Sequence, residues 1–197
     1  FKMNKAEIIK QVREFAIKAH EKCEYHGGPF VTHLDQVAAI LHDHGYDDVA
    51  HQCTAYLHDL LEDTEVDQLT LLKFLTGIND LPQQANCIFS ATVFCTDAPG
   101  PSRRVRKRAT YRRQRNEIND FIDDDTTIAI GLWTGIRVKV ADRIANVSSC
   151  LLNRFDLIPM YLRERDAFYL ALQRDGVCDT MWKKLEELHD DAEQRSS

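Results

Sequence analysis

Four ionisable side chains lie close together in the stretch Thr54–Thr64, which is otherwise mostly apolar. They are His58, Asp59, Glu62 and Asp63. Apolar residues recur around them at helical spacing, which predicts one buried helix through the whole stretch. His58 and Glu62 are four residues apart, and the two aspartates are as well, so each pair points to roughly one side of such a helix. An imidazole and three carboxylates are costly to bury unless they are paired or hold a metal ion; a solvated acidic edge is the simpler alternative.

Three polar side chains elsewhere in the chain could complete a site of this kind. His33 falls in the first turn of a helix that Thr32 is expected to cap, where a solvated or backbone-bonded imidazole is the simpler explanation. Asp142 and Asn146 lie one turn apart on one face of an apolar helix, and a buried aspartate needs a partner. A salt bridge from Asp142 to Arg143 or to another helix explains the aspartate about as well as a metal ion does.

One dense positive segment, residues 102–115, stands out in a chain whose net charge is −6. The negative total argues against the whole surface being a nucleic-acid platform. A run of like charges is usually a solvated helix face. So many cations repel one another, however, that a phosphate-bearing partner is a competing hypothesis, and the planar fork of arginine suits phosphate oxygens.

Helical periodicity recurs along the rest of the chain, and no convincing run of strands is present. Asn4 could cap the first helix, and Asp48 could start the third. The sequence therefore predicts an all-α protein of roughly eight to ten helices. Breaks are expected at residues 24–30, 96–101 and 120–127. The first helix is expected over residues 4–23, the second begins at Thr32, the third spans about 47–63, and the fourth begins within 64–67 and ends at Gly77. Further helices are expected over 81–95, 103–115, about 126–151, 158–173 and 177–190.

Length and composition favour a single domain. The chain has 197 residues, of which 44% are hydrophobic and 28% are charged, and this is ordinary for a soluble globular protein. The domain is expected to span residues 3–197, because Phe1 and Lys2 precede Met3 and read as a remnant of expression. No apolar run approaches membrane-spanning length, and no signal-peptide pattern is present. The six cysteines form no Cys-x-x-Cys pair, so the reducing cytoplasm is the expected location.

The site candidates follow the order His33, His58-Asp59, Asp142, which resembles the metal-binding signature of the HD phosphohydrolase superfamily of helical enzymes. The flanking residues resemble one family within it more specifically, the RelA/SpoT-type alarmone hydrolases. Four segments spread over about residues 12–150 are similar to motifs of that family: Gly28–His33 with Val37-Ala38, Ala55–Thr64, Thr96-Asp97 with Arg106–Arg108, and Lys139–Asn146. The length is typical of a stand-alone hydrolase domain, a small alarmone hydrolase, so we expect no synthetase or regulatory domain.

The resemblance implies that a divalent ion is held by His33, His58, Asp59 and Asp142. Two imidazoles and two carboxylates form a mixed nitrogen and oxygen site, for which Mn²⁺ is expected and with which Fe²⁺, Zn²⁺ and Co²⁺ are compatible. The implied reaction is hydrolysis of the 3′-pyrophosphate of (p)ppNpp alarmones, the nucleotides of the stringent response. It would release pyrophosphate and a nucleoside 5′-di- or triphosphate.

The same resemblance implies roles for further residues. Glu62 and Asp63 would position the attacking water or move its proton. Asn146 would donate a hydrogen bond to the ribose or a phosphate while Asp142 holds the metal. The basic helix would neutralise the charge that develops on the pyrophosphate leaving group. The leading candidates for these phosphate contacts are Lys107 and Arg108, followed by Lys139.

Two departures from the family pattern affect these expectations. Leu34 replaces the proline that usually follows the first metal-binding histidine, a change expected to alter local stiffness more than chemistry. The loop before Gly28 usually carries an Arg-Lys pair whose arginine packs on the nucleobase, but residues 23–26 contain no arginine. Tyr25 or His26 could stack on a base instead. We therefore hypothesise that adenine alarmones, (p)ppApp, are accepted as well as or better than ppGpp.

Other functions stay open on the sequence alone. A different HD nucleotide phosphohydrolase, such as a 5′-nucleotidase or an NADPH 2′-phosphatase, would use the same metal site, although intact Glu62 and Asp63 favour the alarmone hydrolase. A catalytically dead HD module could bind nucleic acid through residues 103–115, but it would have no need of this costly set of side chains. A purely structural helical adaptor leaves the buried charges unexplained. We expect a small nucleotide substrate, no membrane and no nucleic acid; the oligomeric state is left open.

Overall fold

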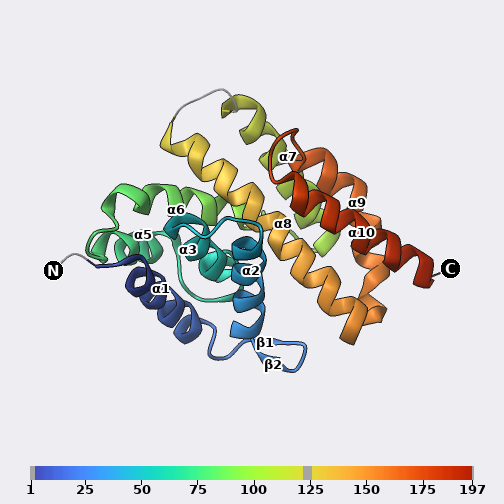
Figure 1. Cartoon of the computed structure of the whole chain (residues 1–197), viewed down its shortest axis with the longest axis horizontal. Helices are drawn as coiled ribbons and strands as arrows, with labels where there is room; N and C mark the ends of the chain where they lie inside the picture. The colour runs from blue at the N-terminus through green and yellow to red at the C-terminus, as the bar shows by residue number, and fades with distance from the viewer. Residues whose placement is uncertain (1–2, 122–125, 197) are drawn as a thin grey trace.

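Figure 1 shows the computed structural model of the chain, which describes residues 3–121 and 126–196. Phe1 and Lys2 lie outside the described residues, as do residues 122–125 of the expected acidic break. Within the described ranges the chain forms ten α-helices, one short 3₁₀ turn and a two-stranded hairpin, which confirms the predicted all-α class and helix number. The helices are α1 Lys5–Ala19, α2 Val31–Asp43, α3 Val49–Leu57, α4 Leu60–Asp63, α5 Gln68–Gly77, α6 Pro82–Cys95, α7 Arg103–Phe121, α8 Thr127–Asn153, α9 Ile158–Leu172 and α10 Asp179–Ser196. The hairpin is β1 Glu24–Tyr25 and β2 Gly28–Pro29, and the 3₁₀ turn η1 is Phe155–Leu157.

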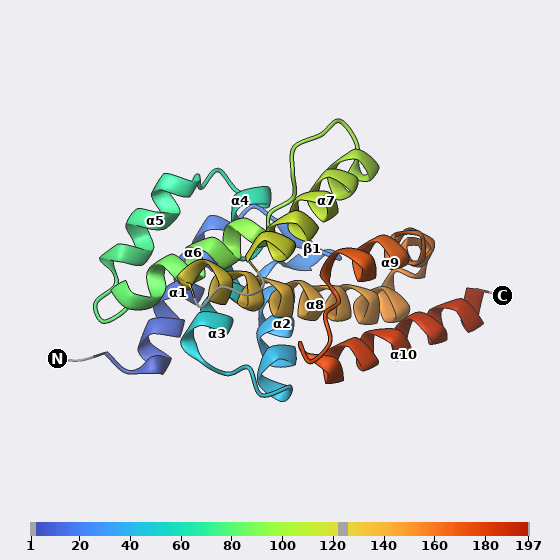
Figure 2. The ribbon, with the colours of Figure 1, turned by 90° about the horizontal axis from the view of Figure 1, so that it is seen from above.

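The long helix α8 runs through the middle of the molecule, with the other helices packed around it (Figures 1 and 2). It contacts six other helices, α2, α3, α6, α7, α9 and α10. Apolar side chains point outward on every side of its central turns, as expected for a helix that is buried all round. The exceptions in these turns are the buried side chains of Lys139, Asp142 and Arg143, which mark the position of a polar site inside the helical core.

Two glycines on α8 allow α6 to approach it closely. A Cβ atom added at Gly135 would lie 2.5 Å from Cδ1 of Phe94, and one added at Gly131 would lie 2.9 Å from Cβ of Ser90. Both distances are too short for real carbon contacts, so α6 could not pack at this depth against larger residues. The close contact holds the N-terminal half of α8 in place and so fixes the register of the polar residues one to two turns further on.

Capping residues explain where several helices begin. Asn4 accepts a hydrogen bond from the backbone of Glu7, whose side chain accepts from the backbone of Asn4 in return, so the predicted cap of α1 is confirmed as a capping box. Asp48 caps α3 as predicted. The prediction that Thr32 caps the second helix is wrong. Helix α2 begins at Val31, and the preceding residue, Phe30, already has helical dihedral angles because the hairpin leads directly into the helix.

The segment expected to be a loop at residues 24–30 forms the small hairpin β1–β2. His26 and Gly27 at its tip both have positive φ angles, 51° and 82°, as the tight turn between two such strands requires. The hairpin is useful to the site because it directs Tyr25 toward α8, where its hydroxyl donates a hydrogen bond to Asn146. In the described part of the chain, no helix is both long and apolar enough to cross a lipid bilayer.

His189 on α10 makes the stability of the fold depend on pH. Its side chain is buried, and neither ring nitrogen has a hydrogen-bond partner among the described residues. Burial and the nearby charges of Arg143 and Arg165 lower its pKa to about 4. An unfolded chain has a histidine pKa of about 6.5, so between pH 6.5 and pH 4 only the unfolded state takes up this proton. The free energy of unfolding should therefore fall by about 3 kcal/mol as the pH falls through this window.

We expect His189→Leu to remove this contribution, so that the variant loses less stability between pH 6.5 and pH 4 than the wild type does. Urea unfolding at a series of pH values measures the difference. The matched control is His42→Leu, which replaces a histidine whose side chain is 70% exposed and should keep the wild-type slope. Equal slopes for His189→Leu and the wild type would show that His189 is protonated in the folded state.

Candidate metal centre

The turn that joins α3 to α4 carries His58 and Asp59. The prediction of one helix through Thr54–Thr64 is wrong, because α3 ends at Leu57 and α4 begins only at Leu60. Asp59 has φ −100° and ψ 0°, at the edge of the helical region, and this opens the helix. The open turn lets both side chains approach one point: Nε2 of His58 lies 3.0 Å from Oδ2 of Asp59. Helical spacing alone cannot foresee such a break, since the apolar pattern continues across it.

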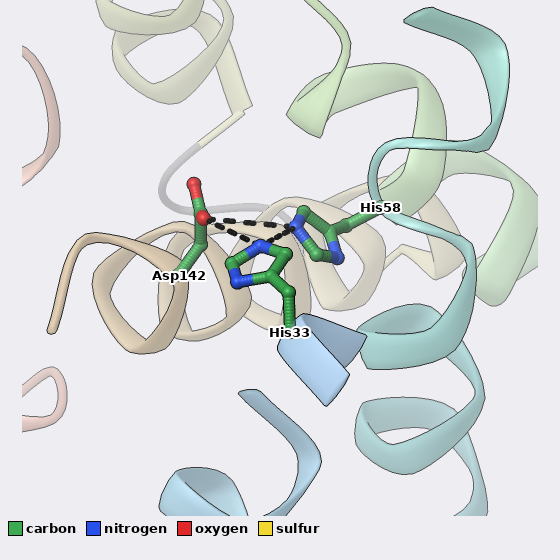
Figure 3. A group of neighbouring side chains, drawn as sticks. All are labelled: His33, His58 and Asp142. Carbon is green, nitrogen blue, oxygen red and sulfur yellow. Dashed lines mark hydrogen bonds and ion pairs between the residues drawn. The ribbon is translucent and has the colours of Figure 1, made fainter. Parts of the chain in front are cut away.

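His33 from α2 and Asp142 from α8 join this pair, so that all four predicted metal ligands converge. Figure 3 shows His33, His58 and Asp142 pointing toward one another. Nε2 of His33 lies 3.3 Å from Nε2 of His58 and 3.2 Å from Oδ1 of Asp142. Nε2 of His33 also lies 3.6 Å from Oδ2 of Asp59, and Nε2 of His58 lies 3.7 Å from Oδ1 of Asp142. Donor atoms from three distant parts of the chain thus surround one point.

The negative charges of Asp59 and Asp142 in this cluster require positive charge close by. His33, His58 and Asp142 are buried, and Asp59 is partly buried. Burial lowers the pKa of His58, but Asp59 and Asp142 more than reverse the effect and raise it to about 10. Burial alone would raise the pKa of both aspartates, yet the charges of His58 and Lys139 hold the two pKa values below the usual range. The two carboxylates are therefore balanced by Lys139 together with either protons on the imidazoles or a metal ion.

The orientation of the imidazoles suits a metal ion. Nδ1 of His58 donates a hydrogen bond to the carbonyl oxygen of Ala55 over 2.8 Å, so Nε2 is the atom that faces the cluster. Backbone hydrogen bonds of this kind fix the tautomer of metal-binding histidines. His33, His58 and Asp142 each present one donor atom, and these atoms lie within 4.8 Å of one another. This group could hold a metal ion, with Asp59 as a fourth donor at its edge.

Lys139 and Asn146 orient Asp142 from both sides along α8. Nζ of Lys139 lies 3.3 Å from Oδ2 of Asp142, and Nδ2 of Asn146 donates to Oδ1. Burial lowers the pKa of Lys139, but the surrounding carboxylates of Asp142 and Glu62 raise it well above its usual value, so the lysine stays charged. The alternative partner for Asp142 considered from the sequence, Arg143, instead pairs with Glu164 at 3.2 Å.

A cavity of about 270 Å³ opens beside the cluster. Six residues predicted for catalysis or substrate binding line it: Tyr25, Glu62, Asp63, Lys107, Lys139 and Asn146. Two others do not. Arg108 lines a separate groove between α7 and α9. His26 lies outside the cavity lining, where Nδ1 is 3.0 Å from Oγ of Ser149 and the ring stacks on Tyr25.

Glu62 and Asp63 lie on α4 at the wall of this cavity. Oε1 of Glu62 accepts a hydrogen bond from the backbone N–H of Asp97 over 2.6 Å, and the side chain of Asp97 pairs with Lys107 at 2.9 Å. Desolvation in the cavity raises the pKa of Glu62. Desolvation and the charge of Asp59 raise the pKa of Asp63 to about 6. Both carboxyl groups therefore hold a proton more readily than an ordinary carboxylate does, which is a feature of groups that exchange protons in active sites.

The structure adds cavity residues that the sequence did not single out. They are Phe30, Arg103, Arg106, Arg143 and Tyr161. Arg106 is one residue before the favoured Lys107, and the guanidinium of Arg106 has no hydrogen bond or ion pair among the described residues. The Arg106–Arg108 segment of the sequence indicated that Arg106 could bind phosphate. Only the helix register shows which cations of that segment face the cavity. Tyr161 comes from α9, where no pattern in the sequence marks it.

No family model matches the chain, and no protein with a curated description matches its sequence significantly. Among solved structures, the chain is similar to that of a metazoan ortholog of SpoT, described as hydrolysing ppGpp and playing a role in starvation responses. The two share 19% sequence identity, and the match covers 93% of this chain and 94% of that chain with a TM-score of 0.67. The likeness shows a common fold, so the HD-type fold predicted from the sequence is confirmed over nearly the whole chain.

Proposed function

We propose that the protein is a Mn²⁺-dependent hydrolase that removes the 3′-pyrophosphate of (p)ppNpp alarmones. The observation that carries the proposal is the convergence of His33, His58, Asp59 and Asp142 beside a cavity lined by cations and carboxylates. The fold shared with a ppGpp hydrolase supports it independently. We also expect the enzyme to work in the reducing cytoplasm, since its six cysteines are free thiols.

The donor set fits a divalent metal ion of intermediate hardness. His33 and His58 would supply nitrogen, and Asp59 and Asp142 would supply oxygen, which suits Mn²⁺ among other first-row ions. When bound, the ion would polarise the scissile phosphoryl group and lower the pKa of a water molecule. The two aspartate charges would be neutralised by the ion, and Lys139 would hold Asp142 in the orientation that it already has.

The protein side chains supply the remaining chemistry. Water attacks the phosphorus atom next to the ribose 3′ oxygen and gives up a proton to a carboxylate. The bond from that phosphorus to the 3′ oxygen breaks, the 3′ oxygen takes up that proton as the leaving group, and pyrophosphate is released with the oxygen of the water. We assign the proton of the attacking water to Glu62 or Asp63, because both line the cavity and both have raised pKa values. The backbone N–H of Asp97 holds Glu62 in one orientation, so this carboxylate is the better positioned of the two.

Cations on the cavity wall are suited to the pyrophosphate group. Arg106 has no partner within the described residues, and Lys107 is held at the cavity by Asp97. Lys139 is less available because it already neutralises Asp142. We therefore assign the pyrophosphoryl group to Lys107 and Arg106, whose positive charges would stabilise its negative oxygens as water attacks. Asn146 is assigned to the ribose side, next to Asp142.

We expect ppApp to be hydrolysed at least as efficiently as ppGpp. Residues 23–26 offer no arginine for a guanine base, and the ring of Tyr25 is already stacked on His26 and His33, with centroids 4.2 and 4.6 Å apart. Tyr25 lines the cavity whereas His26 lies outside its lining, so neither ring replaces the missing arginine as a contact that selects guanine. Values of kcat/KM for the two alarmones with Mn²⁺ measure the ratio. A strong preference for ppGpp would reject this assignment of base specificity without touching the metal chemistry.

A further inference from the structure

A second, larger cavity lies outside the metal centre, in the groove between α7 and α9. Its volume is about 1030 Å³, and the two helices that form it lie side by side at one side of the molecule (Figure 2). Arg103 and Lys107 line both this groove and the metal cavity, so the groove meets the cavity at its edge. Lys107 lines this groove and is assigned to the proposed hydrolysis, but the arginines further along α7 have no role in it.

The walls of the groove carry unpaired positive charge. Five exposed arginines form no hydrogen bond or ion pair through their guanidinium groups among the described residues. They are Arg104, Arg108, Arg112 and Arg115 on α7 and Arg163 on α9. Among the described residues, Glu164 is the one carboxylate that lines the groove, and it is already shared between Arg103 and Arg143. In a chain with a net charge of −6, such a concentration of cations favours a negatively charged partner.

The floor of the groove is apolar and is provided by α9. Leu170 is 63% exposed, although it is a large hydrophobic side chain. Met160, Ala167 and Ala171 lie at helical spacing beside it and line the same groove. Ala167 is small and exposed, so a partner's backbone can approach closely there, whereas Ala171 is already buried. The arginine row from Arg104 to Arg115 extends about 17 Å along α7, which is about three turns of a helix.

We infer that this groove docks an acidic amphipathic helix of a partner protein. Its apolar face would cover Leu170 and Ala167 of α9, and its carboxylates would pair with the arginines of α7, as in other helix-in-groove complexes. The floor does not suit single-stranded nucleic acid, which stacks its bases on exposed aromatic rings, since the one aromatic side chain lining the groove, Tyr111, is buried. A second copy of this chain would offer the acidic α10, but the apolar side chains of α10 are already buried in its own core.

The probe is a blocked 20-residue peptide with leucines on one helical face and glutamates on the other. We expect it to bind the full chain with one-to-one stoichiometry in titrations followed by fluorescence anisotropy, and to perturb the NMR methyl signals of Ala167 and Leu170. Leu170→Asp should weaken binding at least tenfold. The matched control is Leu152→Asp, the same change at an 82% exposed leucine of α8 outside the groove, which should leave the affinity unchanged.

Two further probes keep the proposal falsifiable. A scrambled peptide of the same composition keeps the charge but has no apolar face, and it should bind at least tenfold more weakly. A single-stranded oligonucleotide should bind no better than the scrambled peptide. The proposal is overturned if the helical peptide does not bind, if the scrambled peptide binds equally well, or if the oligonucleotide binds more tightly and is insensitive to Leu170→Asp. None of these measurements uses catalysis, so they are independent of the proposed hydrolase activity.

Discussion

Asp142→Asn is expected to abolish Mn²⁺-dependent alarmone hydrolysis, lowering kcat/KM by about a thousandfold or more, or about 4 kcal/mol in transition-state stabilisation. The substitution keeps the size of the side chain but removes the negative charge that faces His33, His58 and Lys139. The metal would lose one of its two anionic ligands, and the positive charge of Lys139 would repel it. Steady-state kinetics and Mn²⁺ titration by electron paramagnetic resonance measure the two losses together.

A matched control separates this effect from a general loss of an aspartate. Asp35→Asn breaks the ion pair of Asp35 with Arg13, away from the metal cavity, and should leave both kcat/KM and Mn²⁺ affinity close to wild type. Circular dichroism should show that Asp142→Asn remains folded, because the hydrogen bond from Asn146 can still be accepted by the amide oxygen. If Asp142→Asn retained wild-type Mn²⁺ affinity and turnover, Asp142 would not be a metal ligand.

Glu62→Gln is expected to lower kcat by about a hundredfold to ten-thousandfold while leaving Mn²⁺ affinity within a few-fold of wild type. The amide can still accept the hydrogen bond from the backbone of Asp97, so the orientation of the side chain should survive. It cannot accept a proton from water, however, and that is the role assigned to Glu62. Single-turnover kinetics with Mn²⁺-loaded protein measure the chemical step separately from substrate binding.

The control for this prediction is Glu65→Gln, the same change three residues further on at an exposed position outside the cavity lining. It should leave both kcat and Mn²⁺ affinity unchanged. A Glu62→Gln variant with wild-type kcat would move the proton transfer to Asp63, which Asp63→Asn would then reveal. A loss of Mn²⁺ binding in Glu62→Gln would instead make Glu62 a part of the metal site.

The apolar patterns of the sequence were sufficient to predict the helices, because a helix that buries one face or all faces has apolar residues at regular spacing. They failed at His58-Asp59, where the helix opens although the apolar spacing continues. The break lets the side chains of His58 and Asp59 face residues of other helices across the core. The residues next to them in the sequence do not indicate these tertiary contacts. The cap of α2 failed for a related reason, since the hairpin before it sets the dihedral angles of Phe30 directly.

The candidate metal ligands could be proposed from the sequence because each lies in a distinctive segment, and the structure brings those segments together. The lining of the cavity was harder to predict. Arg108 and Lys107 are neighbours in one basic run, but α7 turns only Lys107 toward the metal cavity and directs Arg108 into the other groove. Tyr161 reaches the cavity from α9 purely through tertiary packing. A charge run can indicate that phosphate is bound, but the helix register decides which of its residues are in place.

The most direct test of the proposed function is product analysis after the protein has been stripped with a chelator and reloaded with Mn²⁺. Incubated separately with ppGpp and ppApp, it is predicted to release pyrophosphate and the nucleoside 5′-diphosphate in equal amounts from at least one of them. The release should disappear without the metal and in the Asp59→Ala variant. If the Mn²⁺-loaded protein releases no pyrophosphate from either alarmone, the proposal is contradicted, and NADPH becomes the next substrate to test.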